Sequence, residues 1–205
     1  MHLHKPACAA LAAALSLAAA PALASDGPPS QTQDVQIAQS TLSLLGYYDG
    51  SLDGDFDQAT RAALERALLD THYAGAFDSL DAPVMGFLAS LAGPALAEAF
   101  GTDPTGTWDV DLSGLSADER RALLDLHQWE SLALCASPLA MHIQGMALGT
   151  WLYGFTGALT LADGALTPLP DPERPDHPQP GFTFVDVDTM QRVVDGAIET
   201  WHRCK

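Results

Sequence analysis

The chain has 205 residues, and 26 of them are Asp or Glu against nine Lys or Arg, which gives a formal net charge of −17 at pH 7. A surface this acidic repels phosphate backbones and anionic lipid headgroups. The charge therefore excludes nucleic acid as a partner, and it excludes a polybasic role on a membrane surface. It does not identify a ligand.

The first 24 residues have the pattern of a secretory signal peptide. A short cationic start at 1–5 precedes an apolar run of small residues at 9–20, and Ala22-Leu23-Ala24 offers a small-x-small cleavage site. The run is too short and too rich in alanine for a membrane-spanning helix. We therefore expect cleavage near Ala24, a linker at 25–32, and a periplasmic or secreted location in a bacterial cell envelope.

The cysteines agree with export. Cys8 would leave with the signal peptide, so Cys135 and Cys204 remain as an even pair in an oxidising compartment. Cys135 has no neighbouring cation in the sequence that would lower its pKa and make it a nucleophile. We therefore expect a disulfide between Cys135 and Cys204.

Residues 46–64, GYYDGSLDGDFDQATRAAL, allow two interpretations. The first is a calcium loop of the EF-hand kind, which needs a bidentate carboxylate at its twelfth position. Counted from Asp49, the twelfth position is Thr60, whose hydroxyl cannot replace a carboxylate. Gly46 also ends the preceding helix before the loop begins, so we expect neither a metal nor a cofactor here.

The second interpretation is the hinge of a helical hairpin. Upstream apolar residues recur at helical spacing and stop at Gly46, which suits the left-handed position after a helix. Asp57 can cap the next helix, and Asp53-Gly54 is a turn signal. Phe56 is the bulky residue that can pin this turn to the core. The buried faces are predicted to be Val35, Ala38, Leu42 and Leu45 on the first helix, and Thr60, Ala63, Leu64, Ala67 and Leu68 on the second.

Residues 35–64 resemble the putative peptidoglycan-binding domain family, whose recurrent pattern is L-x-x-L-G-Y-Y-x-G-x-x-D-G-x-F-G-x-x-T-x-x-A-L. The chain departs from it at Asp57, where the family has glycine, and at Ala67-Leu68, where the family has Phe-Gln. The resemblance implies a three-helix module over residues 33–75 that binds cell-wall peptidoglycan non-covalently.

The hinge supplies the candidate ligand-binding residues of this module. Its tyrosines could offer an aromatic face to a sugar ring or to an apolar stem peptide, and its aspartates could accept hydrogen bonds from stem-peptide amides or amines. In the alternative interpretation one tyrosine is a core residue and the aspartates are turn residues. The predicted ligand-binding residues are Tyr47, Tyr48, Asp49, Asp53 and Asp55.

The remainder, residues 76–205, resembles no family over its length and is predicted to be a helical domain of unknown function. An apolar stretch up to Phe100 reads as one helix or two, and alternation around Trp108 predicts a short strand. A capping box from Ser116 to Glu119 should start a helix that runs towards Cys135.

Residues 131–162 carry no formally charged side chain, and 139–162 are long enough to span a bilayer. Interspersed polar residues and acidic flanks favour a buried helix or helix pair instead of a membrane span. Six prolines in 168–180 predict an extended connector. A short strand at 182–187 and a last helix from Asp188 to Trp201 should follow.

No zinc-hydrolase or serine-hydrolase motif occurs in the sequence. The segment from Trp129 onward faintly resembles a lytic transglycosylase stretch, in which Glu130 would be the general acid. The alternative is a solvated Glu130 on a capped helix. We therefore favour a non-enzymatic, mainly α envelope protein that binds peptidoglycan, with a wall-lytic enzyme and a module that binds an envelope protein as the other hypotheses.

Overall fold

The computed structural model describes residues 31–75, 79–150, 155–170 and 180–205. The predicted signal peptide and most of the proline-rich connector lie outside these residues. The described helices are α2 (Gln31–Leu44), α3 (Gln58–Asp70), α4 (Ala82–Phe100) and α5 (Ala117–His127). The described strands are β1 (Gly106–Val110), β2 (Met141–Gln144), β3 (Ala147–Thr150), β4 (Phe155–Ala162), β5 (Ala165–Pro168), β6 (Thr183–Asp186), β7 (Thr189–Val194) and β8 (Ala197–Arg203).

The strands form one antiparallel sheet in the order β5-β4-β3-β2-β1-β8-β7-β6. Chain neighbours pair from β1 to β5 and from β6 to β8, and β8 returns to pair with β1. The two outer strands meet at a single bridge between Leu166 and Phe182, so the sheet is curled until its edges touch. The expected mainly α fold was therefore wrong, because all eight strands of this sheet come from the chain after α4.

The Asp195-Gly196 step explains why the end of the chain is a hairpin and not the predicted last helix, and the Asp163-Gly164 step turns the chain in the same way between β4 and β5. Asp195 and Gly196 have φ values of +50° and +81°, and Asp163 and Gly164 have +51° and +74°. Two consecutive positive φ angles belong to the tight turn that matches the twist of paired strands. The stretch 188–201 consequently folds into β7 and β8, which pair from Thr189 to His202.

Two other predicted helices are also corrected. The range 139–162 contains β2, β3 and β4, with Gly145 in the turn between β2 and β3, so the expected buried helix or helix pair was wrong. The helix that begins at the Ser116 capping box is confirmed, but it ends at His127. Gln128 then has φ of +55°, which stops the helix before Cys135.

The strands predicted around Trp108 and at 182–187 are confirmed as β1 and β6. The disulfide between Cys135 and Cys204 is present, with the two Cα atoms 5.4 Å apart. It joins the long connection between β1 and β2 to the residue that follows β8.

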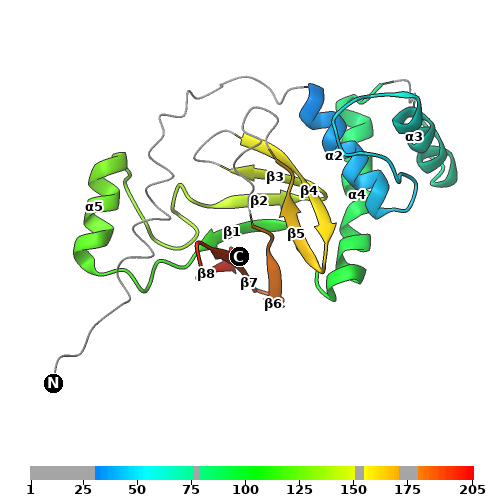
Figure 1. Ribbon diagram of the computed structural model, residues 1–205. Helices are drawn as coiled ribbons and strands as arrows, with labels where there is room; N and C mark the ends of the chain where they lie inside the picture. Colours follow the sequence, from blue (N-terminus) through cyan, green and yellow to red (C-terminus); the bar gives the residue numbers. More distant parts are fainter. Residues whose placement is uncertain (1–30, 76–78, 151–154, 171–179) are drawn as a thin grey trace.

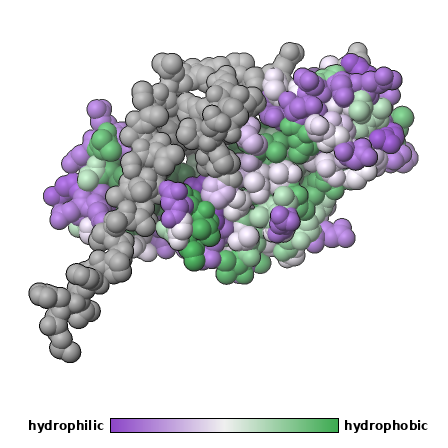
Figure 2. All heavy atoms as spheres, in the orientation of Figure 1, coloured by the Kyte–Doolittle hydropathy of each residue, from purple (hydrophilic) through white to green (hydrophobic). Residues whose placement is uncertain are grey.

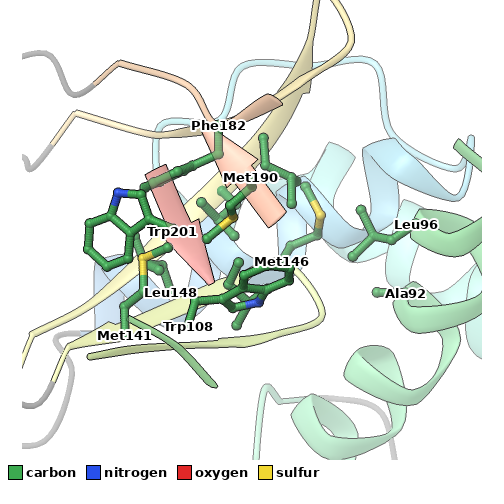
Figure 3. Close-up of a cluster of buried hydrophobic side chains, with 12 residues drawn as sticks. Ala92, Leu96, Trp108, Met141, Met146, Leu148, Phe182, Met190 and Trp201 are labelled. Carbon is green, nitrogen blue, oxygen red and sulfur yellow. The ribbon is translucent and has the colours of Figure 1, made fainter. Parts of the chain in front are cut away.

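The concave face of the sheet is filled by large side chains (Figure 3). Trp108, Phe182 and Met190 are almost completely buried there, and Trp201 meets the ring of Phe182 edge-on. Two residues of α4, Ala92 and Leu96, complete this sheet core. The sheet therefore depends on a helix for part of its core.

Helix α4 also belongs to a second core. Val84 and Leu88, near its start, pack with α2 and α3 in a helical core. The stripe Val84, Leu88, Ala92 and Leu96 lies along one side of α4 and is buried throughout. Within the described residues, α4 is also the one helix long and apolar enough, by length and composition alone, to cross a membrane.

Helix α2 packs on both α4 and β4 (Figure 1). Residues 35–42 of this helix are all buried, which a helix shows when it is covered on more than one side. The two cores are thus joined by α2 and α4.

Candidate functional site

The helical hairpin forms as predicted, except that Leu45, predicted on the buried face of the first helix, lies just beyond α2 and is half-buried. Gly46 has φ of +78° and ends the turn after α2. Asp57 caps α3, because its carboxylate accepts a hydrogen bond of 2.8 Å from the backbone N–H of Thr60. The predicted buried face of α3 is confirmed at all five positions: Thr60, Ala63, Leu64, Ala67 and Leu68.

The hinge loop, defined here as residues 46–57, is held by the side chain of Gln39 on α2. Gln39 is fully buried. Its Oε1 accepts from the backbone N–H of Gly54 at 2.9 Å. Its Nε2 lies within hydrogen-bonding distance of the Tyr48 hydroxyl, an Asp53 carboxylate oxygen, the Asp55 carbonyl and the Thr60 hydroxyl, at 3.0–3.3 Å. One amide therefore fixes the conformation of the loop.

Gly54 is required where the loop approaches α2 most closely. Its φ is +81°, and a Cβ placed there would lie 2.6 Å from the backbone oxygen of Thr32. Neither the backbone angle nor the space suits a larger residue. The Asp53-Gly54 turn signal is thus explained by a close contact between the loop and α2.

Two of the five predicted ligand-binding residues, buried Tyr48 and exposed Asp53, make hydrogen bonds that hold the loop together. Tyr48 is 7% exposed, and its hydroxyl donates to the carbonyl of Ser51 at 2.9 Å. The Asp53 carboxylate accepts from the backbone N–H of Asp55 and from Gln39. These contacts agree with the alternative interpretation of one core tyrosine and a turn aspartate.

The other three predicted residues line the outside of the loop. Asp49 and Asp55 are exposed and Tyr47 is half-buried. Arg66 of α3 donates to the Tyr47 carbonyl at 2.7 Å. Burial and the charge of the neighbouring Asp70, which also accepts the tyrosine hydrogen bond, raise the pKa of Tyr47. We call Tyr47, Asp49 and Asp55 the loop rim.

Hydrogen bonds to the Asp53 and Asp57 carboxylates lower the pKa values of these two groups below the ordinary value of 3.8. The N–H of Asp55 is the main cause at Asp53, and the N–H of Thr60 is the main cause at Asp57. A carboxyl group whose pKa is lower in the folded than in the unfolded chain stabilises the fold at pH values above its unfolded pKa. This stability is lost as the pH falls through the pKa of the folded state.

This sign gives a prediction for the α3 cap. The stability that the charge of Asp57 adds over a neutral Asn should be present at pH 7 and should be lost progressively as the pH falls below about 4. Thermal unfolding of the wild type and of Asp57→Asn, followed from pH 7 to pH 3, measures it. The gap between the two melting temperatures should close on acidification, and a gap that stays constant would contradict this account of the cap.

The loop carboxylates do not converge on a common point. Among the described residues, no group of three or more His, Cys, Asp or Glu side chains is placed to hold a metal ion. Asp53 instead faces Gln39, and Asp57 faces the start of α3.

Glu130, the alternative general acid, is exposed in the connection that follows α5. Helix α5 and the hairpin of α2 and α3 lie at opposite ends of the molecule (Figure 1). The surface around the α3 end is largely hydrophilic (Figure 2). The structure therefore does not bring Glu130 to the hinge loop.

Gln39 is the residue that sequence reasoning missed. A signal was present, since Gln39 adjoins Ala38 and lies one helical turn before Leu42 and Ser43, beside the predicted apolar stripe. A polar side chain in this position must find partners when the helix is covered. Those partners come from the hinge loop and the start of α3, 9 to 21 residues further along the chain.

Comparison with known proteins agrees with this geometry. Residues 31–67 match the family described as "Putative peptidoglycan binding domain". The match covers α2, the hinge loop and most of α3. No curated protein and no solved structure matches the chain.

Proposed function

We propose that this protein, whose residues 31–67 match a peptidoglycan-binding family, attaches non-covalently to the bacterial cell wall through its hinge loop. The family match is the observation that carries the proposal. Export to the cell envelope is part of it, and the predicted signal peptide at 1–24 and the Cys135–Cys204 disulfide support that part.

The loop rim is the part of the hinge loop that we assign to ligand contact. Asp49 and Asp55 project carboxylates outward, where amines and amides of a stem peptide could donate to them. Tyr47 adds a partly exposed ring beside them. Because Gln39 fixes the backbone behind this rim, the loop loses little conformational entropy on binding.

Sedimentation with purified cell-wall sacculi tests the proposal. Neutralising the rim with Asp49→Asn and Asp55→Asn together should weaken retention roughly tenfold, which corresponds to the loss of one charge-assisted contact. The unfolding temperature should stay unchanged, since neither side chain is buried.

The matched control is the pair Asp118→Asn and Asp125→Asn on α5, which makes the same change in net charge on exposed residues of another element. Retention of this control should equal that of the wild type. Equally weakened retention of both variants would show that the effect comes from net charge and would contradict the assignment. Wild-type retention of the rim variant would also overturn the assignment. Absence of retention in the wild type would instead favour a protein partner for the module.

A further inference from the structure

The connection between β1 and β2, residues 111–140, carries α5 and has a long stretch with few attachments. No residue from Leu124 to Ala136 is buried. In the described structure, two polar or covalent links join this stretch to the sheet, and both are made by Cys135. Its other hydrogen bonds are local, such as that from Trp129 N–H to the Leu124 carbonyl.

The first link runs from the backbone N–H of Cys135 to Asp109 of β1, at 2.7 Å. Asp109 is fully buried, and its other carboxylate oxygen accepts from the hydroxyl of Ser137 at 2.8 Å and from the N–H of Val110 at 2.9 Å. A buried carboxylate is costly unless donors surround it, so Asp109 and the backbone near Cys135 hold one another in place.

The second link is the disulfide to Cys204. Asp109 pairs with His202 across β1 and β8, and the N–H of Cys204 donates to the carbonyl of Thr107 at 2.8 Å. Asp109 and Cys204 therefore lie on adjoining strands in fixed register. By holding Cys135 through its N–H, Asp109 keeps the thiol of Cys135 beside that of Cys204.

We propose that the Cys135–Cys204 disulfide is a thiol-sensitive latch on the segment that carries α5, and that Asp109 is the positioning residue that aligns Cys135 for its closure. Cys135 is exposed, so a thiol reductant can reach its sulfur. It also has φ of +66°, an unfavourable backbone conformation for a residue with a side chain, which the two links maintain.

Opening the latch is an ordinary exchange reaction. A thiolate attacks Sγ of Cys135, forms a mixed disulfide, and expels the Cys204 sulfur as a thiolate that takes up a proton. A second thiol then attacks the outer sulfur of the mixed disulfide and releases Cys135. Two thiols become one external disulfide, and their two electrons and two protons end on Cys135 and Cys204.

Equilibration with glutathione redox buffers tests the role of Asp109. In Asp109→Asn the amide presents N–H groups to a site built for an acceptor, so the equilibrium constant for closing the disulfide should fall roughly tenfold to hundredfold. Ser137→Ala, which leaves Asp109 in place, should produce a smaller fall. Asp125→Asn, an exposed change on α5, should leave the constant unaltered.

Asp109→Asn is then made in the Cys135→Ser and Cys204→Ser double variant, which completes a double-mutant cycle between Asp109 and the disulfide. A positioning role predicts that Asp109→Asn destabilises the disulfide-bonded protein and the cysteine-free protein by different amounts. Equal losses in both backgrounds, or a wild-type closing constant in Asp109→Asn and Ser137→Ala, would overturn the proposal.

Hydrogen exchange before and after reduction with dithiothreitol tests the latch itself. Exchange should rise within residues 117–136, while β1, β2, β7 and β8 keep their protection. Unchanged exchange in 117–136 would overturn the proposal, and so would a uniform loss of protection across the sheet, which would make the disulfide a staple of the entire fold.

Discussion

Replacing Gln39 by leucine should destabilise the protein by about 2–4 kcal/mol and should abolish retention on sacculi. Leucine has a similar volume, so the loss comes from hydrogen bonds and not from a cavity. The buried N–H of Gly54 would lose its acceptor, and the Tyr48 and Thr60 hydroxyls would lose a donor. Chemical denaturation gives the stability, and sedimentation with sacculi gives the retention.

Gln36→Leu on the same helix is the matched control. Gln36 is also buried, but within the described residues its side chain makes one hydrogen bond, of 3.2 Å, to the carbonyl of Leu52. Its loss should cost about 1 kcal/mol and should leave most of the retention. Similar costs for the two variants would contradict the assignment of Gln39 as the residue that fixes the loop.

Shortening a buried side chain in either half of α4 should lower the midpoint of a single unfolding transition that the helical core and the sheet core share. Leu88→Ala removes a side chain from the helical core, and Leu96→Ala removes one from the sheet core; both residues are almost completely buried. Each change should cost about 2–5 kcal/mol, the usual range for such cavities. Because one rigid helix contributes to both cores, tryptophan fluorescence should report both losses.

The tryptophans make this measurement selective. Two of the four tryptophans, Trp108 and Trp201, belong to the sheet core, and neither belongs to the helical core, so the fluorescence of these two follows the sheet. Calorimetry and fluorescence of Leu88→Ala should give the same midpoint. A helical transition that precedes the fluorescence change would show that the two cores unfold separately and would contradict the role given to α4.

The sequence predicted the hairpin of α2 and α3 well because its signals are local. The cap at Asp57, the stop at Gly46 and the five buried residues of α3 each depend on neighbours within a few positions. The start of α5 was predictable for the same reason, since the capping box joins Ser116 to Glu119. Such short-range patterns need no knowledge of the tertiary fold.

The sheet was missed where a helical period and a strand period fit the same residues. From Met190 to Trp201 the apolar positions suit a helix, yet Val193 and Ile198 are 59% and 64% exposed. They form a cross-strand pair on the outer face of β7 and β8. The Asp195-Gly196 dipeptide between them is a hairpin-turn signal, and it decides the structure here although the apolar residues also have helical spacing.

The sequence predicted that the site is a loop, but not which of its residues are buried and which lie at the surface. The sequence alone cannot say that Tyr48 turns inward while Tyr47 stays at the surface, because this depends on the depth at which the loop meets Gln39. The buried roles of Gln39 and Asp109 likewise depend on partners far along the chain, at separations of 21 and 26 residues for Thr60 and Cys135.

Hydrogen exchange of the full chain with and without soluble peptidoglycan fragments tests the central claim most directly, because it locates the contact without any substitution. Attachment through the loop rim predicts added protection confined to residues 46–57 and the adjoining start of α3. Protection that appears on α5 and the 128–136 stretch instead, with the hinge loop unchanged, would contradict the claim.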